Sequence, residues 1–139
     1  MAVFVNSAIQ TVEADDNIIY TSGTGCNNNI MRRTGSGVIS LKGCTSQCKA
    51  KYLVIFSGNI AVATGGTVGE ISIGLSIDGE EIPTSQAIVT PAAVGDYFNV
   101  TVFALVDVTK GCCASVAIKN TSDTDIDVQN AQLLVRREA

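Results

Sequence analysis

The run of strand-forming residues from Tyr97 to Val108 constrains the fold of this chain more than any other stretch. Side chains in a strand alternate between two faces, so Val102 and its even-numbered neighbours share one wholly apolar side. The other side carries Tyr97, Phe103 and Leu105, although a sheet packed on a single core normally turns polar residues to water. We therefore expect this strand to be covered on both faces.

The segment from Lys51 to Val62 is predicted to be a second strand of this kind, with Leu53 and Ile55 on the face that the core does not need. No helix is visible in the sequence to form a second cover. We infer that another copy of the same subunit covers these faces in a homotrimer. The residues predicted to form the trimer interface are Tyr97, Phe103, Leu105, Leu53 and Ile55.

The rest of the chain predicts an all-β protein with no significant helix. About nine or ten short strands follow one another, with turns roughly every 8 to 12 residues, which is typical of an antiparallel sandwich or jelly roll. The whole chain, 1–139, is expected to be one domain. Residues 1–12 are expected to form either a first strand or an N-terminal docking arm. Asp78-Gly79 is the strongest hairpin signal.

Two details of individual strands are also predicted. The segment from Ile71 to Ile77 alternates cleanly between apolar residues and Ser or Gly, which indicates a strand with one face in water. Gly58, inside the second two-faced strand, is expected to bend that strand or to mark a β-bulge.

Composition argues against several classes of function. The net charge is −4 and the pI about 4.6, which gives no electrostatic reason to expect nucleic acid or an anionic membrane as partner. The sequence has no His, so the commonest general base and the commonest metal ligand are both missing. We therefore expect no catalysis and no cofactor. No apolar stretch reaches the roughly 18 residues of a membrane span, and the N-terminus lacks the features of a signal peptide.

Other candidate motifs are weak. The glycine-rich stretches at 22–25 and 35–37 lack the GK[ST] of a phosphate-binding loop and are expected to be turns. Asp123, Asp125 and Asp127 have the spacing of calcium ligands, but no Gly or distal Glu completes the pattern, so a solvated turn is expected.

Three segments carry a resemblance to a known fold: Tyr52 to Phe56, Gly95 to Val100 and the closing Asn130 to Val135. In order and character they resemble the trimeric jelly roll shared by tumour necrosis factor, the globular heads of complement proteins and the C-terminal domains of bacterial spore-surface glycoproteins. The resemblance implies a trimeric jelly-roll head. The chain differs from the spore-surface proteins because it has no Gly-X-Y stalk.

Three other segments are similar to small proteins encoded in prophages of gut-dwelling Firmicutes: Ile60 to Thr67, Ile88 to Val94 and Lys110 to Cys113. This resemblance implies a structural protein of a bacteriophage virion, either a capsid decoration protein or a head-fibre protein. It would be made in the host cytoplasm, lie on the virion surface and contact the major capsid protein or another virion protein. The alternative is a trimeric receptor-binding or glycan-binding head on a fibre tip or spore surface.

The five cysteines leave alternatives open. Cys44 and Cys48 are separated by three residues, and Cys112 and Cys113 are adjacent, which is unlike the usual zinc-ligand spacing. No metal is therefore expected. One interpretation is small buried thiols that pack as apolar groups. Another is a disulfide that joins Cys26 to Cys44 or Cys48 after the particle leaves the cell.

Overall fold

The computed structural model describes residues 2–24, 29–32 and 35–138, and these residues form twelve strands and a single 3-10 turn. The strands are β1 (Ala2–Asn6), β2 (Gln10–Val12), β3 (Ser22–Thr24), β4 (Ile30–Arg32), β5 (Ile39–Lys42), β6 (Lys49–Val62), β7 (Ile71–Ile77), β8 (Glu80–Glu81), β9 (Ala87–Val89), β10 (Phe98–Thr109), β11 (Cys113–Asn120) and β12 (Ile126–Arg137), and the turn is η1 (Pro83–Ser85). Within this part of the chain, no helix is long and apolar enough to cross a membrane.

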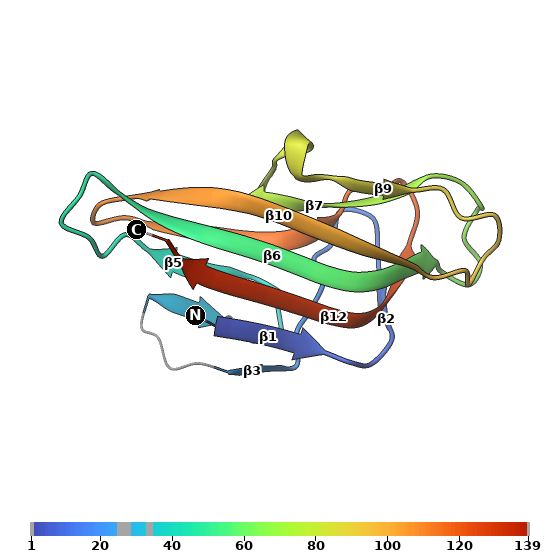
Figure 1. The fold of residues 1–139 in the computed structure, drawn as a ribbon. Helices are drawn as coiled ribbons and strands as arrows, with labels where there is room; N and C mark the ends of the chain where they lie inside the picture. The colour runs from blue at the N-terminus through green and yellow to red at the C-terminus, as the bar shows by residue number, and fades with distance from the viewer. Residues whose placement is uncertain (1, 25–28, 33–34, 139) are drawn as a thin grey trace.

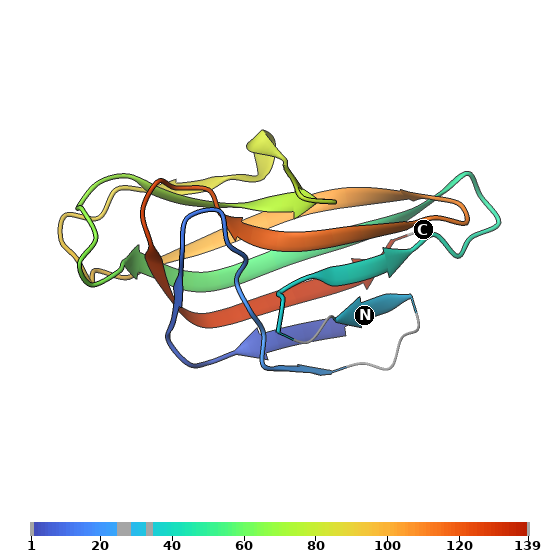
Figure 2. The same cartoon turned by 180° about the vertical axis from the view of Figure 1, so that it is seen from behind.

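The strands form two antiparallel sheets that pack face to face. The first sheet has the order β10-β6-β12-β1-β3, with β2 also paired to β12, and lies in front in Figure 1. The second sheet has the order β4-β5-β11-β7-β8, with β9 beside β7, and is seen from behind in Figure 2. From β5 onward the long strands alternate between the sheets, so the chain crosses the sandwich repeatedly. The predicted all-β jelly roll is confirmed.

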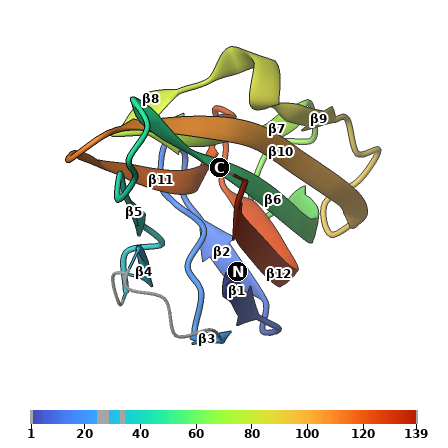
Figure 3. The same ribbon diagram turned by 60° about the vertical axis from the view of Figure 1, so that its left-hand side comes forward.

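The space between the two sheets holds a core built mainly from Val, Ile and Leu, and Figure 3 shows the two layers from nearer their ends. Tyr52 and Phe56 of β6 and Val102 and Val106 of β10 all point into this core and are fully or almost fully buried. The predicted inner faces of both long strands are therefore correct. Strand period alone was sufficient to identify them.

The N-terminal segment is part of the first sheet. Strand β1 pairs with β12 along Ala2↔Val135 to Asn6↔Ala131 and with β3 on its other side. The side chains of Ala2 and Phe4 are buried. Within residues 2–12, both β1 and β2 are paired strands of the first sheet, and a docking role of this segment stays a prediction.

Strand β7 differs from the expectation of one wet face. Its serines at 72 and 76 are buried as well as its isoleucines. The Ser72 hydroxyl lies 2.6 Å from that of Thr121, and Ser85 of the 3-10 turn donates its hydroxyl to Ile82 while accepting from the Leu75 amide. The prediction was wrong because neighbouring loops fold over this face and satisfy its polar groups.

Two turn and bulge expectations can also be compared with the structure. Asp78 and Gly79 both have positive φ, 52° and 86°, and connect β7 to β8 as predicted. The irregularity near Gly58 lies in the partner strand, where the register of β12 shifts between Gln129 and Gln132. Gly58 faces this bulge, and a Cβ on it would meet the Phe56 ring at 2.9 Å.

Candidate functional site

A row of apolar side chains crosses the outer face of the first sheet. Phe103 of β10 lies opposite Ile55 of β6, Ile55 lies opposite Leu134 of β12, and Leu134 lies opposite Val3 of β1. Side chains directly opposite one another on one face of antiparallel strands are in contact range. With strands about 4.8 Å apart, the row is about 14 Å long.

A second, shorter row lies beside it toward the chain termini. Leu105 lies opposite Leu53, which in turn lies opposite Arg136. The next pair along β10 and β6 is Asp107 with Lys51, and both side chains are exposed. Charged residues therefore mark the border of the apolar surface on this side.

Polar residues mark the opposite border. Thr101, Ser57 and Gln132 form the next row across β10, β6 and β12. Beyond them Asn99 donates an amide hydrogen to the Asn59 side-chain oxygen over 3.1 Å. We call the surface between the two borders the apolar face, and it consists of Phe103, Leu105, Leu53, Ile55, Leu134 and Val3.

The two β10 residues of the apolar face are the most exposed large apolar side chains that the structure describes. The exposed fraction is 69% for Phe103 and 63% for Leu105, whereas Leu53 and Ile55 are half-buried. Strand β10 is the edge of its sheet and pairs only with β6. An apolar patch rimmed by polar residues, next to an open sheet edge, is typical of a protein interaction surface.

Four of the five residues predicted for the trimer interface are therefore brought together, and Tyr97 is separate. It precedes β10 and is six residues from Phe103, with the polar Asn99 and Thr101 between them on the same face. Partial burial, and then the nearby Asp127 carboxylate, raise the pKa of Tyr97 above its usual value. Tyr97 thus belongs to the opposite, acidic part of the sheet.

Leu134 and Val3 were not predicted as part of this surface. The sequence signal was present, because Leu134 and Val3 alternate with buried neighbours on their own strands. What the sequence did not supply was the order β10-β6-β12-β1, which places the four side chains in one row. Strand neighbours far apart in the chain cannot be found from periodicity.

The four cysteines that the structure describes are gathered at one end of the sandwich. Cys44, Cys48, Cys112 and Cys113 are all free and exposed, so the interpretation as small buried thiols is wrong for these four. The β5–β6 loop and the β10–β11 turn meet there, because the Gly43 amide donates to the Cys112 carbonyl (2.8 Å) and the Lys110 amide to the Cys48 carbonyl (3.0 Å). The predicted partner Cys26 lies outside the described residues, so its disulfide stays a prediction. No cluster of metal-ligating side chains occurs in the part of the chain that the structure describes.

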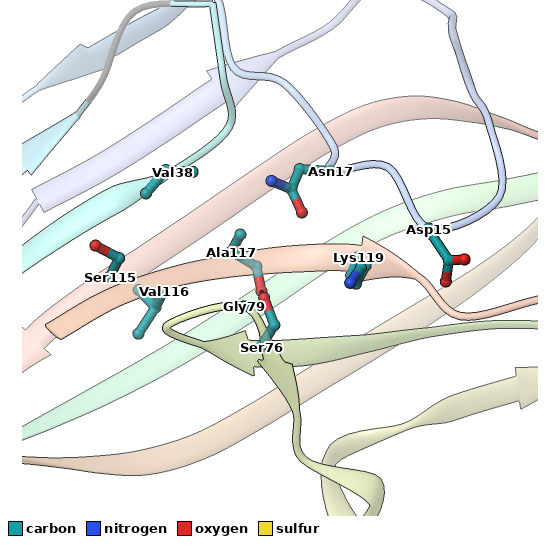
Figure 4. A pocket seen from close by; sticks show the side chains of 9 residues that line it. All are labelled: Asp15, Asn17, Val38, Ser76, Gly79, Ser115, Val116, Ala117 and Lys119. Carbon is teal, nitrogen blue, oxygen red and sulfur yellow. Dashed lines mark hydrogen bonds between the residues drawn. The ribbon is translucent and has the colours of Figure 1, made fainter.

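A shallow hollow of about 160 Å³ opens where β5 begins beside β11 (Figure 4). Asp15, Asn17 and Lys119 lie toward one end of it and Ser115 toward the other. Its full lining is Asp15, Asn17, Val38, Ser76, Gly79, Ser115, Val116, Ala117 and Lys119. The hollow is smaller than the roughly 300 Å³ of most small-molecule sites, so it suits water or one small polar group.

A larger open hollow of about 370 Å³ lies over β4, β5 and β11. Arg32 and Lys42 line it, and none of the described residues that line it is acidic. Arg32 also donates to the Tyr20 carbonyl over 2.6 Å, which fixes its guanidinium on the sheet. Beside this hollow, the Asp78 carboxylate accepts a hydrogen bond from the Ser115 backbone amide over 2.9 Å.

No protein-family model matches this sequence, and no curated protein matches it. Among solved structures, the globular domain of a zebrafish complement 1qA protein is similar, with a TM-score of 0.58 and 11% identity over 96% of this chain and 94% of that chain. The C-terminal domain of the sugar-binding protein EclA gives a TM-score of 0.42 and 16% identity over 94% of this chain and 80% of that chain. The complement domain shows that the fold is shared. At such low identity the likeness says nothing of function, and a TM-score below 0.5 adds no argument.

Proposed function

We propose that this chain is a non-enzymatic structural protein that assembles into homotrimers through the apolar face. The observation that carries this proposal is the row Phe103, Ile55, Leu134 and Val3, which is apolar across four strands although it lies on the side of the sheet away from the core. Burying Phe103 and Leu105 against a neighbour would remove two large side chains from water, each contributing roughly 1.5 to 3 kcal/mol. A second copy is the partner that is always present at matching concentration.

The choice of three copies is supported by the fold. A complement globular domain shares the architecture, and the sequence resembles jelly rolls that are trimeric. In a cyclic trimer each subunit contacts its two neighbours through two different patches, and the apolar face and the open edge of β10 beside it offer such a pair. Polar borders on both sides of the apolar face fit an interface with an apolar centre and a hydrated rim.

A location on the surface of a bacteriophage virion, as a capsid decoration or head-fibre protein, is the finer part of the proposal. It is supported by the sequence resemblance to prophage-encoded proteins. Because β1 is an integral strand, docking on the capsid would use a loop or an end of the sandwich.

Light scattering behind size exclusion tests the assembly, and the expected mass is three times the 14.4 kDa of the chain. A mass equal to one chain at micromolar concentration would contradict it. Mass spectrometry of purified particles tests the location. We expect each particle to contain a fixed number of copies of this protein, and that number should be a multiple of three. Its absence from particles would contradict the virion role.

A trimeric glycan-binding or receptor-binding head is the second candidate. The hollow beside β11 favours it, because Asn17, Ser115 and Lys119 line a space with room for one small polar group, such as a single hydroxyl of a glycan. A glycan array probed with the wild type and with Asn17→Ala separates the candidates. Binding that the substitution removes would support the head, and no binding to any glycan would leave the structural role.

A further inference from the structure

Most charged residues are segregated along the long axis of the sandwich, while Arg32, Asp78, Glu80 and Glu81 lie between its ends, level with the middle of β11. In Figure 1 the left end carries both termini, the β5–β6 loop and the β10–β11 turn, and the right end carries the loops 63–70 and 90–97. The basic end comprises six cations and two carboxylates: Lys42, Lys49, Lys51, Lys110, Arg136 and Arg137, with Asp107 and Glu138. The acidic end comprises eight carboxylates and one cation: Glu13, Asp15, Asp16, Glu70, Asp96, Asp123, Asp125 and Asp127, with Lys119.

The fold produces this segregation from charges that are scattered through the sequence. The acidic residues lie in or beside the turns β2–β3, β6–β7, β9–β10 and β11–β12, and these turns meet at one end because β6 and β11 end there while β7, β10 and β12 begin there. Two backbone hydrogen bonds hold the first of these turns to the end of β11: the Asp15 amide donates to the Asn120 carbonyl and the Asn120 amide to the Asp16 carbonyl.

The two ends differ in how their charges are compensated. Both ion pairs found among the described residues lie at the basic end, Lys49 with Asp107 (3.8 Å) and Arg136 with Glu138 (2.6 Å). At the acidic end, the Thr11 hydroxyl, which is a neutral group, donates a hydrogen bond to the Asp127 carboxylate over 2.7 Å. The acidic end therefore keeps an excess of negative charge, and like charges in one region repel one another.

We propose that copies of this protein associate end to end, with the basic end of one copy against the acidic end of the next. The two surfaces are complementary in sign, and complementary potentials steer association and fix orientation. The contact is heterologous, and because its two surfaces lie at opposite ends of the sandwich, it generates linear stacks. It uses the ends of the sandwich and leaves the apolar face free, so it goes beyond the proposed trimer and does not depend on it.

Trimer formation would strengthen the contact without being required. A threefold axis along the strands places three basic ends on one side of the ring and three acidic ends on the other. Three simultaneous contacts then act as one multivalent contact. Stacking of trimers would give a fibre, while stacking of monomers would give short and weaker chains.

Sedimentation equilibrium of the full chain at two ionic strengths tests the proposal. We expect an average mass several times larger at about 0.01 M salt, where the screening length is about 30 Å, than at about 1 M, where it is about 3 Å. The triple variant Lys42→Glu/Lys51→Glu/Lys110→Glu should lose the low-salt increase. All three side chains are exposed, so the fold should be retained, which circular dichroism checks.

Two controls separate a specific contact from a general effect of net charge. Glu80→Lys/Glu81→Lys changes exposed charges on β8, away from both ends, and should keep the low-salt increase. The variant Glu70→Lys/Asp123→Lys/Asp125→Lys, measured by itself, should lose the increase in average mass at low salt. An equimolar mixture of this variant with the Lys-to-Glu variant should show the increase again. A mass that does not depend on salt, or an increase that survives reversal of either end, would overturn the proposal. At high salt the end-to-end contact is screened, so the mass measured there tests the proposed trimer independently of the stacking.

Discussion

Phe103 of β10 lies directly opposite Ile55 of β6, with both side chains on the side of the first sheet that faces away from the core. One residue along each strand, Val102 and Phe56 lie opposite one another inside the core. Two adjacent cross-strand pairs are thus both apolar, but one pair lies in the core and the other on the outer face of the sheet. This relationship is the physical basis of the proposed assembly, since the outer pair has an apolar surface that this chain alone does not cover.

Two tyrosines allow a matched test of buried hydroxyl groups. The Tyr20 hydroxyl is buried with no hydrogen-bond partner among the described residues, whereas the Tyr52 hydroxyl donates to the Lys42 carbonyl over 2.6 Å. An unsatisfied buried hydroxyl costs roughly 1 to 3 kcal/mol, and a satisfied one contributes about 1 kcal/mol. Tyr20→Phe should therefore raise the free energy of unfolding and Tyr52→Phe should lower it. Urea denaturation measures both, and a loss of stability in Tyr20→Phe would mean that its hydroxyl has a partner.

The buried Tyr20 also predicts how the stability of the protein changes at alkaline pH. Burial raises the pKa of Tyr20 far above the usual value of 10.0, so its neutral form is favoured in the folded state. Above pH 10 the unfolded chain releases this proton and the folded chain keeps it, so stability falls as the pH rises. Spectrophotometric titration should show one tyrosine that ionises only on unfolding. In Tyr20→Phe that step should vanish, and its persistence would contradict the assignment.

The position of β1 predicts a specific cost at the N-terminus. Phe4 is buried and packs near Tyr20, with ring centroids 6.5 Å apart. Phe4→Ala should lower the free energy of unfolding by about 3 kcal/mol, because it leaves a cavity in the core. Val5→Ala, on the exposed side of the same strand, should cost well under 1 kcal/mol. Equal and small costs in both would mean that the segment behaves as an arm in solution.

The four exposed thiols predict reactivity without denaturant. In Cys26→Ser, which removes the cysteine outside the described residues, a thiol reagent should titrate four groups in the folded protein: Cys44, Cys48, Cys112 and Cys113. Elemental analysis of the wild type should show no stoichiometric zinc. Two thiols instead of four would show that two of these cysteines form a disulfide.

Much of the fold could be predicted from local pattern. The period of two placed Val102 on the inner face and Leu105 on the outer face, because alternation is a property of any strand. Asp78-Gly79 marked its hairpin because few residues adopt positive φ at both turn positions. The sequence resemblance then predicted that these strands are arranged as a jelly roll.

What could not be predicted depends on contacts between distant segments. The serines of β7 looked exposed because the loops that cover them, including Thr121 and Ser85, come from elsewhere in the chain. Leu134 and Val3 joined the apolar face only when the strand order was known. The segregation of charge has the same origin, since the acidic end gathers turns between Glu13 and Asp127.

The central claim is that the apolar face holds copies together, and the native mass of Leu105→Asp tests it most directly. Ile88→Asp, at an exposed fraction of 54% on β9 of the second sheet, is the matched control, and Val102→Asp buries a carboxylate in the core and should prevent folding. We predict that Leu105→Asp retains the circular dichroism of the wild type but elutes with the mass of one chain, while Ile88→Asp remains a trimer. A trimeric Leu105→Asp with unchanged thermal stability would contradict the account, because the apolar face would then lie in water.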